Sequence, residues 1–235
     1  MTLKAQAIVL AAGRGERMRP LTDLVPKPLL QVKGKPLIQW PLEALRQGGF
    51  SPVVVNTAWL GNQLVEALGD QVTYSHEGRD FGGALETAGG IVRALPQLDG
   101  VFWVVAGDVF AREFKFTQAA VDRFAASGKF AHLWLVANPV HNLRGDFGLS
   151  ESGLALNLPK HSNALRYTYS TVGLYRQEFF RPPYCVIPSG NPQGVKAPLA
   201  PLLRAGMDNQ QISAEIYTGP WTDVGTPERL AELNR

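Results

Sequence analysis

The chain has 235 residues, of which 45% are hydrophobic and 18% are charged, and its formal net charge is +3. These values are ordinary for a globular protein and allow one large α/β domain or two small ones. No cluster of lysines and arginines of the kind that grips a nucleic-acid backbone occurs, so nucleic-acid binding is disfavoured. A phosphorylated small molecule suits the mild positive excess at least as well.

The single cysteine, Cys185, excludes a disulfide framework and a thiolate zinc cluster. No stretch approaches the roughly 20 apolar residues that span a bilayer. The short apolar run near the start ends in arginines, which a secretory signal would not carry there. We therefore expect a cytoplasmic location without membrane contact. The sequence leaves the oligomeric state open, and a monomer is compatible with it.

The first part of the chain alternates short apolar strands with helices. Strands are predicted at 7–10, 53–55, 71–75, 101–106 and 132–137, and helices at 36–47, 60–68, 87–95 and 118–126. Pro41 lies inside the first of these helices and indicates a later start or a kink. The alternation predicts a mostly parallel sheet with helices on both faces, and such sheets bind ligands at the carboxyl ends of their strands.

The pattern changes after residue 140. Strands with mixed polar and apolar residues are predicted at 149–158, 166–175 and 211–217, and residues 182–201 form a loop-rich stretch with six prolines. We interpret residues 141–220 as a lobe that covers the sheet within one domain, 1–235, and not as an independent domain. A final segment, 221–235, ends the chain in a helix.

The strongest local signal is a glycine-rich loop, Leu10 to Thr22, with the sequence LAAGRGERMRPLT. Small residues directly after a strand let backbone N–H groups approach a phosphate. Arg14, Arg17 and Lys27 add charge that complements a triphosphate. Neither a P-loop, which needs Gly-Lys-Ser/Thr, nor a dinucleotide fingerprint, which needs a third glycine, is present, and this disfavours a Rossmann-type dehydrogenase.

The run from Leu10 to Leu29 resembles the signature of the sugar-nucleotide pyrophosphorylases, L-A-A-G-x-G-T-R-[LM]-x-P-L-T followed by P-K-[PA]-L, with Glu16 in place of the common threonine. The resemblance implies a Rossmann-like three-layer, GT-A-like fold with a central, mostly parallel mixed sheet and a smaller sugar-binding lobe. It implies that Arg17 and Lys27 are catalytic and act on the triphosphate. It also implies nucleotide contacts from Leu10, Ala11, Ala12, Gly13, Arg14 and Gly15.

Two aspartates are candidate metal ligands. Asp108 follows an apolar strand in Ala-Gly-Asp-Val, and Asp223 lies in Trp-Thr-Asp-Val-Gly-Thr. Without further information, each aspartate would more often be a helix-cap or turn residue than a metal ligand. Family members place metal ligands in these two segments, so the resemblance implies Mg²⁺ held by both carboxylates, with the triphosphate completing its shell.

The family's base-recognition loop, often L-G-T-A-G, resembles the stretch that begins at Leu85. The resemblance implies nucleotide contacts from Glu77, Glu86 and Thr87, with Glu86 standing where glycine is frequent and Asp80–Gly83 resembling an insertion. A glycine-rich loop that leads into a helix would explain the same residues and is compatible with binding.

The acceptor sugar phosphate is expected at Ala106, Gly145, Asp146 and Lys196. Asp146 could accept hydrogen bonds from sugar hydroxyls or be a turn residue. Lys196 would neutralise the sugar phosphate, with Lys160, Arg166 and Arg204 as competitors. Ala106 stands where the family carries a polar residue.

Motifs over nearly the whole length resemble the bacterial N-acetylmuramate 1-phosphate uridylyltransferases of cell-wall recycling. The resemblance implies that UTP and a sugar 1-phosphate give a nucleotide sugar and pyrophosphate. Mannose or heptose 1-phosphate guanylyltransferases remain an alternative, as does a catalytically silent nucleotide-sugar-binding relative. The presence of Arg17, Lys27, Asp108 and Asp223 disfavours the silent relative.

Overall fold

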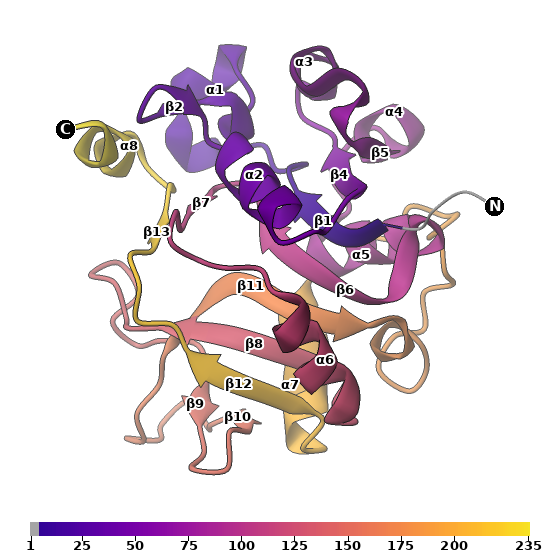
Figure 1. Cartoon of the computed structure of the whole chain (residues 1–235), viewed down its shortest axis with the longest axis vertical. Helices are drawn as coiled ribbons and strands as arrows, with labels where there is room; N and C mark the ends of the chain where they lie inside the picture. The colour runs from indigo at the N-terminus through magenta and orange to yellow at the C-terminus, as the bar shows by residue number, and fades with distance from the viewer. Residues whose placement is uncertain (1–4) are drawn as a thin grey trace.

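Apolar and β-branched runs pair into one seven-stranded sheet in the computed structural model, which describes residues 5–235 (Figure 1). Across the sheet the strands are β12 (Ile212–Ile216), β8 (Ala131–Val136), β11 (Thr168–Arg176), β6 (Leu98–Ala106), β1 (Ala5–Leu10), β4 (Val53–Thr57) and β5 (Thr73–His76). Strands β6, β1, β4 and β5 run parallel, whereas β11 lies antiparallel between β6 and β8. The mixed, mostly parallel sheet is therefore confirmed.

Helices and short elements connect these strands. The helices are α1 (Leu21–Leu24), α2 (Gln39–Gln47), α3 (Gly61–Leu68), α4 (Glu77–Phe81), α5 (Glu86–Ala94), α6 (Gln118–Ala126), α7 (Leu199–Asp208) and α8 (Pro227–Asn234). Short strands form three antiparallel pairs: β2 (Gln31–Val32) with β3 (Lys35–Pro36), β7 (Val109–Phe110) with β13 (Thr222–Asp223), and β9 (Gly148–Leu149) with β10 (Ala155–Leu156). 3₁₀ turns cover Glu16–Met18, Lys27–Leu29, Gly69–Gln71, Leu95–Gln97 and Gln177–Phe180. Among residues 5–235, no helix has the length and apolar character needed to cross a membrane.

Two hydrophobic cores lie on opposite faces of the sheet, because successive side chains of a strand point to opposite sides. Ile8 and Val104 belong to the core that includes residues of α5 and α7, and Val9 and Trp103 belong to the one that includes residues of α2, α3 and α6. Helices thus cover both faces of the sheet, as predicted, and a ligand can reach the sheet only at the ends of its strands.

Most predicted elements are confirmed within two or three residues, and α2 begins at residue 39 because Pro41 fits a first turn. The single strand predicted at 149–158 is wrong: a turn at Gly153, which has a φ of 77°, divides it into β9 and β10. The loop-rich stretch ends earlier than predicted, where α7 begins at Leu199. The predicted lobe, residues 141–220, does more than cover the sheet, because it contributes β11 and β12 to the seven-stranded sheet itself.

We expect Trp103→Ala to lower the free energy of unfolding by about 3–5 kcal/mol, because truncating a large core side chain leaves a cavity. Trp103 is fully buried on β6 and contacts the rings of Phe50, Phe116 and Trp134. Urea unfolding followed by circular dichroism would measure the change. Leu24→Ala is the control, since Leu24 is 79% exposed, and its effect should stay within about 0.5 kcal/mol. Equal losses in the two variants would contradict this description of the core.

Candidate active site

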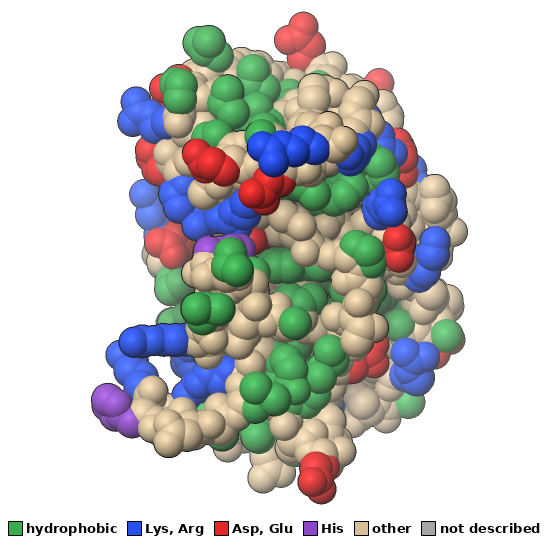
Figure 2. Space-filling view, turned by 90° about the vertical axis from the view of Figure 1, so that its left-hand side faces the viewer, with side chains coloured by type: hydrophobic (Ala, Val, Ile, Leu, Met, Phe, Trp, Pro, Cys, Tyr) green, Lys and Arg blue, Asp and Glu red, His purple; other side chains and the backbone are tan. Residues whose placement is uncertain are grey.

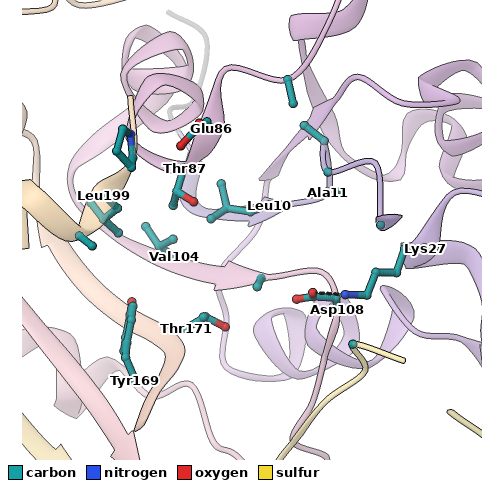
Figure 3. A pocket seen from close by; sticks show the side chains of 18 of the residues that line it. Leu10, Ala11, Lys27, Glu86, Thr87, Val104, Asp108, Tyr169, Thr171 and Leu199 are labelled. Atoms are coloured by element: carbon teal, nitrogen blue, oxygen red, sulfur yellow. Dashed lines mark hydrogen bonds and ion pairs between the residues drawn. The ribbon is translucent and has the colours of Figure 1, made fainter. Parts of the chain in front are cut away.

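A cavity of about 690 Å³ opens at the carboxyl ends of β1, β4 and β6 (Figure 3). Parallel strands place these ends at one edge of the sheet, where ligands bind in such folds. The glycine-rich loop, the start of α5, residues of β11 and the first turns of α7 complete its walls. The predicted residues that line it are Leu10, Ala11, Ala12, Gly13, Gly15, Arg17, Lys27, Glu86, Thr87, Ala106, Asp108 and Asp146.

The register of β1 and β6 sets the geometry of the glycine-rich loop. Leu10 pairs with Ala106, and the Gly107 N–H donates to the Leu10 carbonyl at 2.8 Å. Gly15 has a φ of 67°, and a side chain there would press on Thr22 and Lys27. Glycine is therefore required at residue 15, and the loop returns its backbone to the cavity wall.

Two arginines of the loop, Arg14 and Arg17, differ in their partners. Arg14 donates to the Thr22 carbonyl at 2.7 Å, pairs with Asp23 and lies 3.8 Å from the Trp59 ring centre. These contacts hold the loop against α1, and Arg14 is not one of the described residues that line the cavity. Arg17 is exposed at the cavity and has no hydrogen bond or ion pair from its side chain to any residue in 5–235. Its guanidinium is thus available to an anion.

Lys27 and Asp108 meet across the cavity. The Lys27 ammonium lies 2.5 Å from Asp108 Oδ2, and Figure 3 shows the two side chains pointing toward each other. Lys27 is 8% exposed, and a buried ammonium needs such a partner because burial disfavours an unpaired charge. A bound triphosphate would offer this lysine a second set of anionic partners.

Asp223 reaches the same region through the β7–β13 pair. It stands opposite Val109, and the Val224 N–H donates to the Asp108 carbonyl at 2.9 Å. Asp223 Oδ1 lies 2.5 Å from an Arg229 nitrogen and 2.9 Å from a His141 ring nitrogen. The structure therefore places Asp223 on β13, paired with the strand that directly follows Asp108, although Asp223 is not one of the described residues that line the cavity.

The donor set fits Mg²⁺. Within residues 5–235, no hydrogen bond from the protein reaches Asp108 Oδ1 or Asp223 Oδ2, so each carboxylate keeps one oxygen for a cation. No group of three or more acidic, histidine or cysteine side chains suited to a metal occurs in that range. Mg²⁺ commonly takes one or two carboxylates together with substrate phosphates and water, and two carboxylates match that habit.

Glu77 lies in the protein interior and not at the cavity. It is fully buried, with one carboxylate oxygen accepting from Asn56 Nδ2 and the other from the Leu85 N–H, both at 2.7 Å. Asn56 Oδ1 in turn accepts from the Ala11 N–H at 2.6 Å. The pair thus ties the loop before α5 to the end of β1. Burial raises the pKa of the Glu77 carboxyl, and the two hydrogen bonds oppose the shift.

The start of α5 presents Glu86 and Thr87 to the cavity (Figure 3). Glu86 has a φ of 60°, a left-handed conformation that favours glycine and costs other residues about 1 kcal/mol or more. This conformation explains why glycine is frequent here in the family pattern. The predicted insertion, residues 80–83, ends α4 and forms the bend that precedes α5.

At the other side of the cavity the structure separates the predicted sugar-phosphate residues. Asp146 lines the cavity and accepts from the Tyr169 N–H at 2.8 Å. Gly145 forms a turn with a φ of 63°, and Lys196 is exposed on the loop before α7. Neither residue is among the described residues that line the cavity. Of the competitors to Lys196, Arg204 on α7 does line it.

Tyr169 and Thr171 are among the lining residues that were not predicted from the sequence. A register shift in β11 lies between Tyr169 and Gly173, and within it Thr171 has a φ of 62° and lines the cavity (Figure 3). A positive φ is unusual for a β-branched residue and marks a backbone held by its surroundings. No pattern in the sequence signals this shift, because bulges depend on tertiary pairing.

Comparison with known proteins identifies the class to which this fold and cavity belong. The nucleotidyl transferase family model matches residues 6–235. The chain is 48% identical to the N-acetylmuramate alpha-1-phosphate uridylyltransferase of Neisseria meningitidis serogroup B, over 97% of this chain and 96% of the relative. It is 31% identical to the enzyme of the same name from Caulobacter vibrioides, over 96% and 97% of the two chains.

Solved structures show the same fold. A Bacillus anthracis protein assigned as a glucose-1-phosphate thymidylyltransferase, solved with sucrose, matches with a TM-score of 0.75 and 20% identity, over 97% of this chain and 93% of that one. The chain belongs to the nucleotidyl transferase family. It is therefore an enzyme of the class that transfers a nucleotidyl group, and the predicted family and fold are confirmed.

The raised pKa of Glu77 predicts a pH-dependent stability difference. The folded protein keeps the Glu77 proton in a pH window where the unfolded chain has released it. Its stability contribution is therefore fully present below the ordinary pKa of 4.5 and is lost as the pH rises through the folded-state pKa. We expect the unfolding free energy of wild type minus that of Glu77→Gln to fall as the pH rises from about 4.5. Urea unfolding at a series of pH values tests this, and a difference that grows with pH would contradict it.

Proposed function

We propose that this enzyme transfers a uridylyl group from UTP to N-acetylmuramate 1-phosphate, giving a UDP-sugar and pyrophosphate. The observation that carries the proposal is the cavity itself, where the glycine-rich loop, Arg17 and the Lys27–Asp108 pair converge at the carboxyl ends of the strands. The choice of substrates rests on the two relatives of that name, which match over nearly their full length. Two relatives by sequence, one named for glucose 1-phosphate with UTP and one for mannose 1-phosphate, match over only 60% of their own chains.

The chemistry requires charge control more than proton transfer. An oxygen of the sugar phosphate attacks the α-phosphorus, the bond between the α-phosphorus and its bridging oxygen breaks, and pyrophosphate leaves with that oxygen. Arg17, which has no partner among the described side chains, is placed to bind the leaving pyrophosphate. Lys27 exchanges its Asp108 partner for phosphate oxygens when the nucleotide binds. Both residues then act by positioning and electrostatic stabilisation.

Asp108 and Asp223 are the residues that would hold Mg²⁺. When bound, the ion neutralises charge on the triphosphate. Asp108 has a second function in this proposal, since its carboxylate keeps the buried Lys27 ammonium paired before the nucleotide arrives. Arg229 and His141 hold the Asp223 carboxylate in place through the same oxygen.

The proposal extends to the cellular setting. We propose a cytoplasmic enzyme of cell-wall sugar recycling, acting on small molecules and on neither nucleic acid nor membrane. The presence of one buried cysteine is compatible with a reducing compartment. Because N-acetylmuramate is a sugar of the peptidoglycan wall, an enzyme that activates its 1-phosphate would return that sugar to wall synthesis.

Pyrophosphate release tests the proposed substrates. The protein would be incubated with Mg²⁺ and each pair drawn from UTP, dTTP, GTP, CTP and ATP and from N-acetylmuramate, N-acetylglucosamine, glucose and mannose 1-phosphates. We expect the highest kcat/KM for UTP with N-acetylmuramate 1-phosphate. Preference for GTP with mannose 1-phosphate would show that the proposed substrates are wrong and that the reaction class, nucleotidyl transfer to a sugar 1-phosphate, is right. Binding of nucleotide without any release would favour a silent relative.

Removal of the Asp108 carboxylate should weaken metal binding and leave the Lys27 ammonium without its ion-pair partner. We expect Asp108→Asn to lower kcat by at least about 100-fold, since a buried lysine loses its partner and the triphosphate loses a ligand to its cation. Asp99→Asn is the matched control, because Asp99 is exposed near the opposite end of β6. Steady-state kinetics with UTP would measure both, and Mn²⁺ binding followed by electron paramagnetic resonance would show whether metal affinity falls. Near-normal turnover and metal binding in Asp108→Asn would contradict the assignment.

A further inference from the structure

Arg204 is a partly buried cation at the side of the cavity that faces away from the Lys27–Asp108 pair. It projects from α7, lines the cavity and lies 5.2 Å from the Phe147 ring centre. The Phe147 ring lies 6.5 Å from that of Tyr169, which stands across the cavity from Lys27 and Asp108 in Figure 3. Arg204 therefore lies beside the region where Asp146 would meet the sugar, and away from the residues placed for the triphosphate.

The charge of Arg204 has no carboxylate partner in the part of the chain that the structure describes. Its guanidinium donates to Asn157 Oδ1 at 2.7 Å, and no acidic oxygen in residues 5–235 lies within ion-pair distance. Asn157 is itself held by the two oxygens of Asp208, at 3.0 and 3.1 Å. A guanidinium carries five N–H donors, so most of its donors remain for a ligand. A partly buried, unpaired cation is costly alone and is stabilised by an anion.

The position of the reaction centre limits which anion can reach Arg204. The sugar phosphate must approach the α-phosphorus to about 3–3.5 Å for attack. Both phosphates therefore belong near the Lys27–Asp108 pair, which lies on the opposite side of the cavity from Tyr169 in Figure 3. An anion at Arg204 must then be a second acidic group on the sugar. N-acetylmuramate carries one, the carboxylate of its lactyl ether, which N-acetylglucosamine lacks. A planar guanidinium pairs with a carboxylate through two parallel hydrogen bonds.

The surface of the lobe is consistent with an acceptor that carries extra negative charge. Figure 2 shows basic side chains gathered at the lower left of one face, beside a histidine, where the lobe projects. Arg144 and Lys160 of this lobe are exposed. Arg166 donates to the backbone carbonyls of Leu158 and Pro159 and is thereby used in the fold of the loop. Exposed cations raise the rate of encounter with anionic substrates.

We infer that Arg204 binds a carboxylate of the acceptor sugar and selects N-acetylmuramate 1-phosphate over its uncharged analogues. This inference rests on the proposed function, since it takes that sugar phosphate as the acceptor. Asn157 and Phe147 fix the guanidinium, one by a hydrogen bond and the other by its ring face. Arg204 is thus a specificity-determining residue that takes no part in the transfer of the nucleotidyl group.

Two acceptors of nearly equal shape test the inference. One is N-acetylmuramate 1-phosphate, and the other is its amide, in which the lactyl carboxylate is replaced by a neutral carboxamide. We expect wild type to prefer the acid in kcat/KM by about 10- to 100-fold, the range expected for hydrogen bonds to a charged group. In Arg204→Gln the value for the acid falls by this factor, the value for the amide stays unchanged, and the preference disappears.

Two further variants keep the test decisive. Arg204→Lys retains the charge without the planar fork and should keep part of the preference, and it replaces Arg204→Gln if that variant fails to fold in thermal unfolding. Arg123→Gln removes an exposed cation from α6 and should leave both values unchanged. Equal losses for acid and amide in Arg204→Gln would show phosphate binding or a purely structural role and overturn the inference. A preference that persists in this variant would overturn it too.

The outcome also separates this inference from the proposed function. If wild type transfers no uridylyl group to either acceptor, the proposed function fails, and isothermal titration of the protein with N-acetylmuramate 1-phosphate decides the role of Arg204. The carboxylate site would be supported if Arg204→Gln no longer bound the acid, which wild type binds, and still bound the amide analogue as well as wild type does. Absence of binding to wild type would overturn it.

Discussion

The parallel pairing of β1 with β6 is the constraint on which the rest of the site depends. It sets Leu10 beside Ala106, so that the glycine-rich loop and the Gly107–Asp108 turn leave the sheet at the same level. A side chain on Gly107 would come within 3.0 Å of the Leu10 carbonyl oxygen. A slip of one residue would turn the core face of each strand toward the wrong side. The buried sheet therefore positions the chemical groups at its edge.

Two of the charged groups in this site, Lys27 and Asp223, are compensated before any ligand arrives. Lys27 is held by Asp108, and Asp223 is held by Arg229 and His141. Such pairing avoids an unpartnered charge in a partly buried place. Arg17 and Arg204, in contrast, have no carboxylate partner in residues 5–235, and they lie where we propose the pyrophosphate and the sugar carboxylate. In this proposal, Lys27 therefore exchanges one anionic partner for another when the nucleotide binds. Arg17 and Arg204 acquire an anionic partner only from a ligand.

Sequence alone predicted those parts of the site that are contiguous in the chain. The loop from Leu10 to Gly15 follows a strand directly, and its small residues and arginines signal phosphate binding without knowledge of the fold. The roles of Arg14 and Glu77 could not be predicted in this way. Arg14 has its partners in α1 and Trp59, and Glu77 has its partners in Asn56 and Leu85, which only tertiary packing brings together.

The second half of the chain was harder to predict for a related reason. Strands β8 and β11 join the main sheet through antiparallel pairing between residues far apart in sequence, and the irregularity that exposes Thr171 arises within that pairing. Arg204 was one of several basic residues in a region whose only clear signal was proline. The start of α7 after Pro198 selects it, because the helix turns this side chain toward the cavity and leaves Lys196 exposed on the preceding loop.

The central claim is that the α-phosphorus of the nucleotide is the atom attacked. Tracing isotopic label from UTP tests it most directly, with N-acetylmuramate 1-phosphate as acceptor and separate reactions with α-labelled and γ-labelled nucleotide. The account predicts that the α label appears in the UDP-sugar and the γ label in pyrophosphate. Appearance of the γ label on the sugar would show phosphoryl transfer from the end of the triphosphate and would contradict the account.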